Sequence, residues 1–149
     1  MADQHVMHLK MKLLFLFAFL IIFSGCSSPE DHESKNLEKY IQDPSWQTFD
    51  FSNSFNDWNS LCFLGPYTTQ DAQDKTIGFH SELVATDDDG LITLIFLKNK
   101  TIKNHFQHPR NKGDFIKEIG KCFSKEDSSF IKVNTENTDW VYIIHVDKN

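Results

Sequence analysis

Hydrophobic residues form one long run near the N-terminus and several short runs after residue 60. Residues 13–23 (LLFLFAFLIIF) are eleven consecutive apolar residues, preceded by two lysines and followed by Ser-Gly-Cys. A basic start, an apolar core of about 7–15 residues and small residues at its end are typical of a secretory signal peptide. The run is shorter than the roughly 20 apolar residues that a transmembrane helix needs. We therefore expect residues 1–25 to be a signal peptide, whether translation starts at Met1 or at Met11.

The end of this run, Phe23-Ser24-Gly25-Cys26, resembles the lipobox of bacterial lipoproteins, although leucine is usual at its first position. The resemblance implies that Cys26 is acylated, becomes the first residue of the mature chain and attaches it to a membrane. Ser27 resembles the signal that sorts lipoproteins to the outer membrane of Gram-negative bacteria, where the protein would face the periplasm. Two other interpretations stay open: a plain signal peptide that leaves Cys26 inside the mature protein, and a short buried helix.

The rest of the chain divides into a polar segment and one domain. Residues 26–40 are polar, mixed in charge and contain one proline. Such a composition predicts a flexible tether behind the lipidated cysteine. Residues 41–149 contain no internal repeat and no second linker, and their length is that of one globular domain with its own core.

Short apolar or alternating runs bounded by turn residues predict β-strands. These runs are residues 49–51, 61–64, 79–86, 91–97, 101–106, 130–133 and 140–146. Residues 91–97 (LITLIFL) do not alternate, so we expect a central strand that is buried on both faces. Asp89-Gly90 predicts a hairpin between residues 79–86 and 91–97, and Asn99-Lys100 predicts the next turn. The predicted fold is α+β, a single domain dominated by an antiparallel sheet of five to seven strands with short helices.

Three other segments carry weaker signals. Asp71 begins a possible helical turn. Residues 105–114 predict a loop because they contain Pro109 and Gly113. Residues 115–119 fit either a helical turn or a short strand.

The charge of the protein is negative. The formal net charge is −6, and loss of residues 1–25 removes two lysines and one aspartate, which makes it −7. An acidic surface argues against nucleic acid as a partner and against electrostatic binding to anionic lipid. The acyl groups are then the expected link to the membrane.

The chain has three cysteines, Cys26, Cys62 and Cys122. If Cys26 carries lipid, two remain, and an oxidising compartment would join them in a disulfide. Two free buried thiols are the alternative, and a metal-binding or catalytic cysteine is a further one.

Several chemical motifs are incomplete in this sequence. If Gly90 were the sixth residue of an EF-hand loop, Ala85 and Phe96 would occupy ligand positions, so Asp87-Asp88-Asp89-Gly90 does not predict a calcium site. Four histidines (80, 105, 108 and 145) lack a zinc motif, and G-x-S-x-G is absent. We expect no catalytic residue, no metal and no cofactor, and therefore a protein that is not an enzyme.

Two features of the polar regions have alternative roles. Arg110 is the only arginine, and Asp114 is near enough to form a structural clamp with it, or else Arg110 contacts an anionic ligand. Aromatic residues including Trp46 and Trp58 stand among polar residues, either as core anchors or as a platform for a sugar.

A second resemblance rests on turns, cysteines and aromatic residues. These are Trp58, Leu61-Cys62, Gly65-Pro66-Tyr67, Asp89-Gly90, His108-Pro109-Arg110, Gly113-Asp114-Phe115 and Cys122-Phe123. Together they are similar to a group of small, largely uncharacterised bacterial lipoproteins over roughly residues 55–130, and this resemblance implies no activity.

The functional prediction is a lipid-anchored envelope protein that binds another envelope protein or serves as an accessory module, for example as an immunity protein against a toxin. Tyr67, Asp87, Asp88 and Asp89 are the predicted contact residues, because loops on a rigid scaffold often carry recognition. The alternative is a lipoprotein that binds a small ligand or a glycan.

Overall fold

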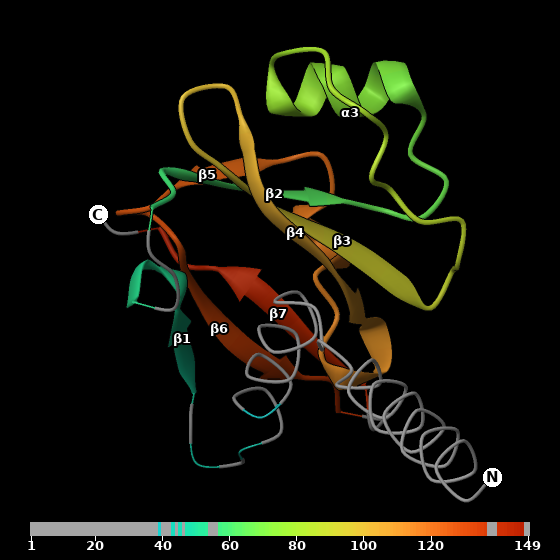
Figure 1. The fold of residues 1–149 in the computed structure, drawn as a ribbon. Helices are drawn as coiled ribbons and strands as arrows, with labels where there is room; N and C mark the ends of the chain where they lie inside the picture. Colours follow the sequence, from blue (N-terminus) through green and yellow to red (C-terminus); the bar gives the residue numbers. More distant parts are fainter. Residues whose placement is uncertain are drawn as a thin grey trace, which may run out of the picture.

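A computed structural model describes residues 39, 43, 45, 47–53, 57–136 and 140–147 of the chain. The predicted signal peptide, the lipobox and Cys26 lie outside the described residues. Over the described part, seven strands form two antiparallel sheets that face each other, and helix α3 (Gln70–Ile77) lies on the outer side of the larger sheet (Figure 1). The predicted α+β class is confirmed, but the strands divide between two sheets.

The larger sheet contains four strands in the order β4-β3-β2-β5. They are β2 (Ser60–Leu64), β3 (Leu91–Leu97), β4 (Ile102–Pro109) and β5 (Cys122–Ser124). Six of the seven residues of β3 are buried, and the strand has a neighbour on each side. The predicted central strand is therefore confirmed.

The smaller sheet contains three strands in the order β1-β6-β7. They are β1 (Thr48–Asp50), β6 (Ser129–Asn134) and β7 (Val141–His145). Phe51 N donates to Ser128 O at 3.0 Å, which joins the end of β1 to the start of β6. Three 3₁₀ turns, η1 (Phe51–Asn53), η2 (Arg110–Lys112) and η3 (Ile116–Glu118), connect the strands.

Aromatic side chains fill the space between the two sheets. Phe51, Phe115 and Phe130 are fully buried there. The rings of Phe51 and Phe130 meet edge to face with centroids 5.5 Å apart, and those of Phe115 and Phe130 do so at 5.8 Å. This is the favoured geometry for aromatic pairs, so the core gains directional contacts in addition to apolar burial.

Helix α3 covers the opposite face of the larger sheet. Thr69 Oγ1 accepts a hydrogen bond from Ala72 N and caps the helix, and Gly78 ends it with a φ of +82°, which glycine adopts easily. Ile77 packs with Ile95 and Leu97 in a second apolar cluster. Because successive strand residues point to opposite faces, covering both faces of β3 explains why its sequence does not alternate.

The predicted strand over residues 79–86 is wrong, and so is the hairpin at Asp89-Gly90. Both edges of β3 are already occupied by β2 and β4, so no place remains beside it. The segment instead runs along α3, where the buried Gln73 amide donates to Glu82 O at 2.7 Å and accepts from Val84 N at 2.9 Å. The Asp89-Gly90 turn is present and leads directly into β3.

The hairpin that does form joins β3 to β4. Lys98 and Thr101 exchange two backbone hydrogen bonds of 2.9 and 3.0 Å, and Asn99 and Lys100 have φ of +51° and +60°. This is the turn that the sequence predicted at these positions, and the structure shows that it has two residues, both left-handed. The predicted loop over residues 105–114 is wrong in its first half, because β4 continues to Pro109.

Candidate functional site

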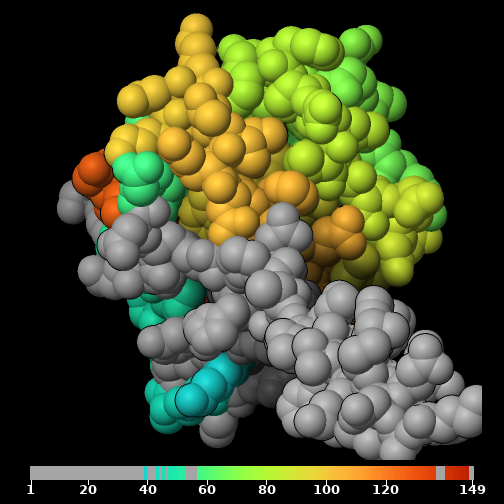
Figure 2. Space-filling model, viewed as in Figure 1, coloured from blue at the N-terminus to red at the C-terminus, as the bar shows by residue number. Residues whose placement is uncertain are grey.

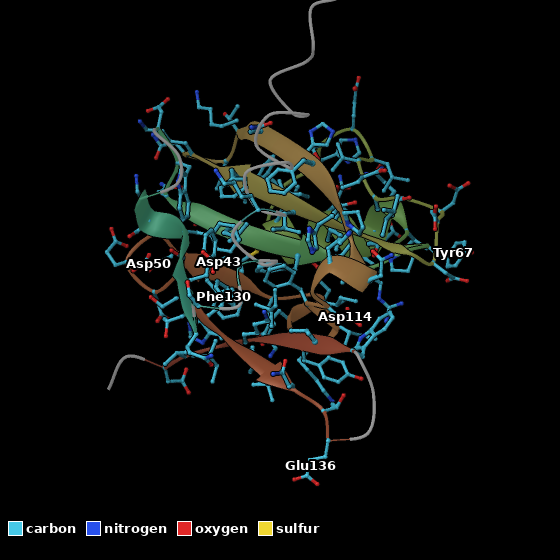
Figure 3. All side chains as sticks on the ribbon, turned by 90° about the horizontal axis from the view of Figure 1, so that it is seen from below. Asp43, Asp50, Tyr67, Asp114, Phe130 and Glu136 are labelled. Carbon is cyan, nitrogen blue, oxygen red and sulfur yellow. A yellow bond between two sulfur atoms is a disulfide. The ribbon has the colours of Figure 1, made fainter. Side chains whose placement is uncertain are left out.

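The candidate site is formed by two neighbouring loops, residues 65–69 after β2 and residues 86–90 before β3. Tyr67 N donates to Thr86 O at 2.8 Å, which holds the two loops side by side. Thr68 Oγ1 donates to Gly65 O at 2.8 Å and closes the first loop. Tyr67 has a φ of +57° and is 63 % exposed, and its side chain projects at the periphery of the molecule (Figure 3).

Three carboxylates lie on the second loop, and all three residues are exposed. The Asp88 carboxylate accepts a hydrogen bond from Gly90 N at 2.7 Å, and Asp88 O accepts one from Leu91 N at 3.1 Å. These bonds orient the loop at the point where it enters β3. The aspartates are therefore carried by a turn that is tied to the central strand.

Tyr67 lies close to these carboxylates. The negative charge of Asp89 raises the pKa of the Tyr67 phenol above its usual value, with further contributions from desolvation, from the charges of Asp87 and Asp88 and from a hydrogen bond to Asp89. The structure thus brings together the four residues that the sequence predicted as contact residues. We call Tyr67, Asp87, Asp88 and Asp89 the acidic loop surface.

Arg110 holds the acidic loop surface against the body of the domain. Its Nη1 donates to Asp89 O at 3.0 Å, and its backbone N donates to Gly90 O at 2.8 Å. Its Nε and Nη2 donate to the two carboxylate oxygens of Asp114 at 3.2 and 2.9 Å. The hydrogen bond to Asp114 raises the pKa of the guanidinium. The predicted Arg110–Asp114 clamp is present.

Asp114 also positions two exposed apolar side chains. Its Oδ2 accepts from Trp140 Nε1 at 3.1 Å, and its Oδ1 accepts from Ile116 N at 3.0 Å. Trp140 is 36 % exposed and Ile116 is 40 % exposed, whereas Asp114 is 1 % exposed. The guanidinium carbon of Arg110 lies 6.0 Å from the centroid of the Trp140 ring. Sequence reasoning missed Trp140 because 26 residues separate it from Asp114 and no local motif connects them.

The predicted disulfide between Cys62 and Cys122 is present. The two residues are directly opposite each other in the β2–β5 pair, with Cα atoms 4.1 Å apart. Cys62 is fully buried under α3, and Cys122 is on the exposed edge of the sheet, where its Sγ lies 3.2 Å from Thr76 O. The disulfide therefore joins the short edge strand to the centre of the domain.

The four histidines considered for zinc lie apart from one another. His80 contacts Asp74 at 2.6 Å, His145 contacts Asp127 at 3.1 Å, and His105 lies on β4 opposite Ile95. His108 is fully buried and its Nε2 donates to Gly113 O at 2.8 Å. In the described ranges, no three potential ligands from histidine, cysteine, aspartate and glutamate gather at one point.

Trp58 is part of the core. It is 4 % exposed and meets Phe96 edge to face with centroids 5.2 Å apart. It therefore has no open ring face for a sugar, and Trp46 lies outside the described residues.

The part of the chain that the structure describes contains no helix with the length and apolar character needed to cross a bilayer. A scan of the sequence against family models, and searches of curated proteins and of solved structures, found no match. The class that the fold defines is a small single-domain α+β protein.

Proposed function

We propose that this chain is a lipid-anchored lipoprotein of the cell envelope whose domain binds another protein through the acidic loop surface. Acyl groups on Cys26 would hold it at the outer membrane, facing the periplasm. One version of this role is an immunity protein that neutralises a toxin arriving there. The observation that carries the proposal is the gathering of Tyr67 and three exposed carboxylates on two loops that are bonded to each other.

The first argument for a binding role is that hydrogen bonds hold the two loops in a fixed position. Arg110 ties Asp89 to the buried Asp114, and Asp88 closes the turn into the central strand. A preorganised loop loses less conformational entropy when a partner binds, so more of the contact energy is available for affinity.

The second argument for a binding role is the type of side chain that is exposed at and beside the acidic loop surface. Tyrosine, tryptophan and arginine are the residues that most often dominate binding energy at protein interfaces. Tyr67 is in the acidic loop surface, and Arg110 connects it to the exposed Trp140. A partner that fits presents lysine or arginine side chains to the aspartates and an apolar group to the aromatic rings. The negative net charge of the chain would speed its encounter with such a partner.

The domain would act by binding and would perform no chemistry. The alternative role, binding of a small ligand or a glycan, has less support because Trp58 is buried. Turnover of an envelope substrate that one side-chain change abolishes would overturn the non-enzymatic role.

The proposal is tested with a triple variant, Asp87→Asn, Asp88→Asn and Asp89→Asn, in the full chain. The full-length protein is used to capture its partner from envelope extract, and the affinity for that partner is measured at low and at high salt. Neutralisation should weaken binding by roughly ten-fold or more at low salt and should flatten the salt dependence.

A matched control changes the same number of charges elsewhere. Asp71→Asn, Glu82→Gln and Glu136→Gln neutralise three exposed carboxylates outside the acidic loop surface. This control should leave affinity within about two-fold, because charges remote from an interface act only through the screened field. Equal effects of the two triple variants, or binding that does not depend on salt, would contradict the proposal.

A further inference from the structure

The two sheets have four outer edges, and they differ in length and cover. β1 and β5 have three residues each. β7 has five residues, and its edge is occupied by Asp114, which donates from N to Val141 O at 2.8 Å and accepts at O from Ile143 N at 2.9 Å. β4 has eight residues, and no described strand or bridge pairs with its outer side. A long open edge is a template for an added strand, and proteins usually shorten or cover such edges.

The register shows which peptide groups of β4 face outward. Arg110 N donates to Gly90 O, so this opposed pair is hydrogen-bonded. The pairing then runs without a shift as far as Phe96 of β3. Because bonded and non-bonded pairs alternate in an antiparallel ladder, His105 and Gln107 are at non-bonded positions and direct their N–H and C=O away from β3. Two residues of β4 therefore offer main-chain donors and acceptors to a further strand.

The hairpin that carries this edge is basic, although the protein is acidic. Residues 91–113 contain no carboxylate, and they include Lys98, Lys100, Lys103, Arg110 and Lys112. Asp57 pairs with both Lys98 and Lys103, and Asp114 pairs with Arg110. The positive excess lies at the hairpin end, where Lys98, Lys100 and Lys103 face a single carboxylate, whereas Arg110 at the other end is paired with Asp114 and feels the charge of Asp89. Figure 2 shows the yellow and orange atoms of this hairpin and of β4 on the surface.

The positive charge of the hairpin helps to decide what kind of strand can pair with the outer edge of β4. A second copy of the chain, paired edge to edge through β4, would place basic side chains against basic side chains, which is destabilising. The same lysines are a common protection against self-association of open edges. A strand that carries carboxylates would instead meet lysines of opposite charge at the hairpin end of β4.

We propose that the outer edge of β4 binds an extended acidic segment of a partner protein, which adds to the larger sheet as a fifth strand. In this mode main-chain hydrogen bonds supply affinity and the side chains supply specificity. The donors and acceptors at His105 and Gln107 would form the main-chain bonds, and the lysines at the hairpin end of β4 would select acidic sequences. This site does not depend on the acidic loop surface or on its proposed partner.

The test uses the full chain in detergent and a labelled octapeptide in which glutamate alternates with valine and threonine. Two control peptides have the same pattern with lysine in place of glutamate, or with N-methylated peptide nitrogens that cannot donate. Binding is followed by fluorescence anisotropy at low salt. The acidic peptide should bind with saturation below roughly 1 mM, and both controls should bind at least about ten-fold more weakly.

The variants of the protein distinguish the contribution of main-chain hydrogen bonds to peptide affinity from that of the side chains. Gln107→Pro removes an outward N–H without breaking a bond to β3, so the domain should fold and the affinity should fall by roughly ten-fold. Gln107→Ala keeps the N–H and should change the affinity by less than about two-fold. Lys100→Gln should weaken binding by roughly two-fold, and Lys75→Gln on α3 should leave it unchanged. Hydrogen exchange at His105 and Gln107 should slow when the acidic peptide binds.

Three results of the peptide-binding measurements would overturn the proposal. They are equal binding of the acidic and basic peptides, affinity that Gln107→Pro does not reduce, and absence of saturable binding at roughly 1 mM peptide. A dimer by analytical ultracentrifugation that Gln107→Pro dissociates would identify a second copy as the occupant and would also contradict it.

Discussion

The carboxylate of Asp114 and the guanidinium of Arg110 meet in two hydrogen bonds of 2.9 and 3.2 Å at a carboxylate that is 1 % exposed. The same carboxylate holds Trp140 Nε1 and Ile116 N. Four donors thus converge on one side chain from three separate parts of the chain. This convergence connects the acidic loop surface, through Arg110, to β7 and to η3.

Asp114→Asn should destabilise the domain. Loss of the buried charge leaves Arg110 without its ionic partner and reduces the number of acceptor sites, so the free energy of unfolding should fall by about 3 kcal/mol. Urea denaturation followed by tryptophan fluorescence measures this change. Asp71→Asn, at an exposed carboxylate on α3, should cost less than about 0.5 kcal/mol. Equal costs for both variants would show that the Asp114 cluster contributes little to stability.

The Cys62–Cys122 disulfide should be an important source of stability. It closes a loop with a sequence separation of 60 residues, for which the loss of unfolded-state entropy predicts about 4 kcal/mol. The double variant Cys62→Ala/Cys122→Ala should lose about that amount in urea denaturation. Intact-mass measurement after alkylation without reductant should find neither Cys62 nor Cys122 alkylated, because both sulfurs are in the disulfide. Two alkylated thiols in protein taken unreduced from the envelope would refute the bond in the cell.

His108 should make the domain sensitive to acid. Desolvation lowers the pKa of His108 from 6.5 to about 4, partly offset by the hydrogen bond to Gly113 and by the charge of Asp114. Above pH 6.5 the His108 imidazole is neutral in both the folded and the unfolded protein, so it does not change the free energy of unfolding. As the pH falls from 6.5 towards 4, the unfolded state takes up a proton that the folded state does not, so stability is lost, by about 3 kcal/mol in total.

The test is to measure the urea midpoint of unfolding at several pH values between 7.5 and 4.5, for the wild type and for His108→Met. Carboxylates titrate in the same range in both proteins, so the difference between the two curves isolates His108. The wild type should lose more stability than the variant on acidification. Parallel curves would mean that His108 keeps its usual pKa in the folded state.

Cys26 should carry the membrane anchor. Each buried methylene contributes about 0.8 kcal/mol, so several acyl chains should hold the protein firmly in a bilayer. Cys26→Ala should release the protein into the soluble fraction or leave it unprocessed, as detergent phase partitioning and intact mass would show. Ser28→Ala, two residues further on, is the control and should behave as the wild type. A Cys26→Ala protein that is processed and still partitions with detergent would contradict the lipobox assignment.

Local sequence was sufficient to predict the elements that are marked by hydrophobic residues between clear turn signals. The runs that became β2 and β3 are apolar and end at turn residues, and the run that became the first part of β4 follows the predicted Asn99-Lys100 turn. Arg110 and Asp114 are four residues apart, so their pairing was also visible locally. The cysteine count predicted the Cys62–Cys122 bond once Cys26 was assigned to the lipid anchor, because the two remaining cysteines allow only one pairing.

Only the tertiary structure decided which strands pair and which side chains meet across the molecule. Residues 79–86 have the alternation of a strand, but the two edges of β3 are taken by β2 and β4, and Gln73 binds the backbone of the segment instead. Trp140 reaches Asp114 because β7 pairs with the chain at residue 114 through a single bridge. Strand pairing and contacts between distant residues depend on which strand edges and sheet faces are occupied by other segments. They therefore cannot be read from any one segment of the sequence. The unpaired outer edge of β4 is a consequence of this occupancy as well, since it is the one long edge in the described part of the chain with which no described strand or bridge pairs.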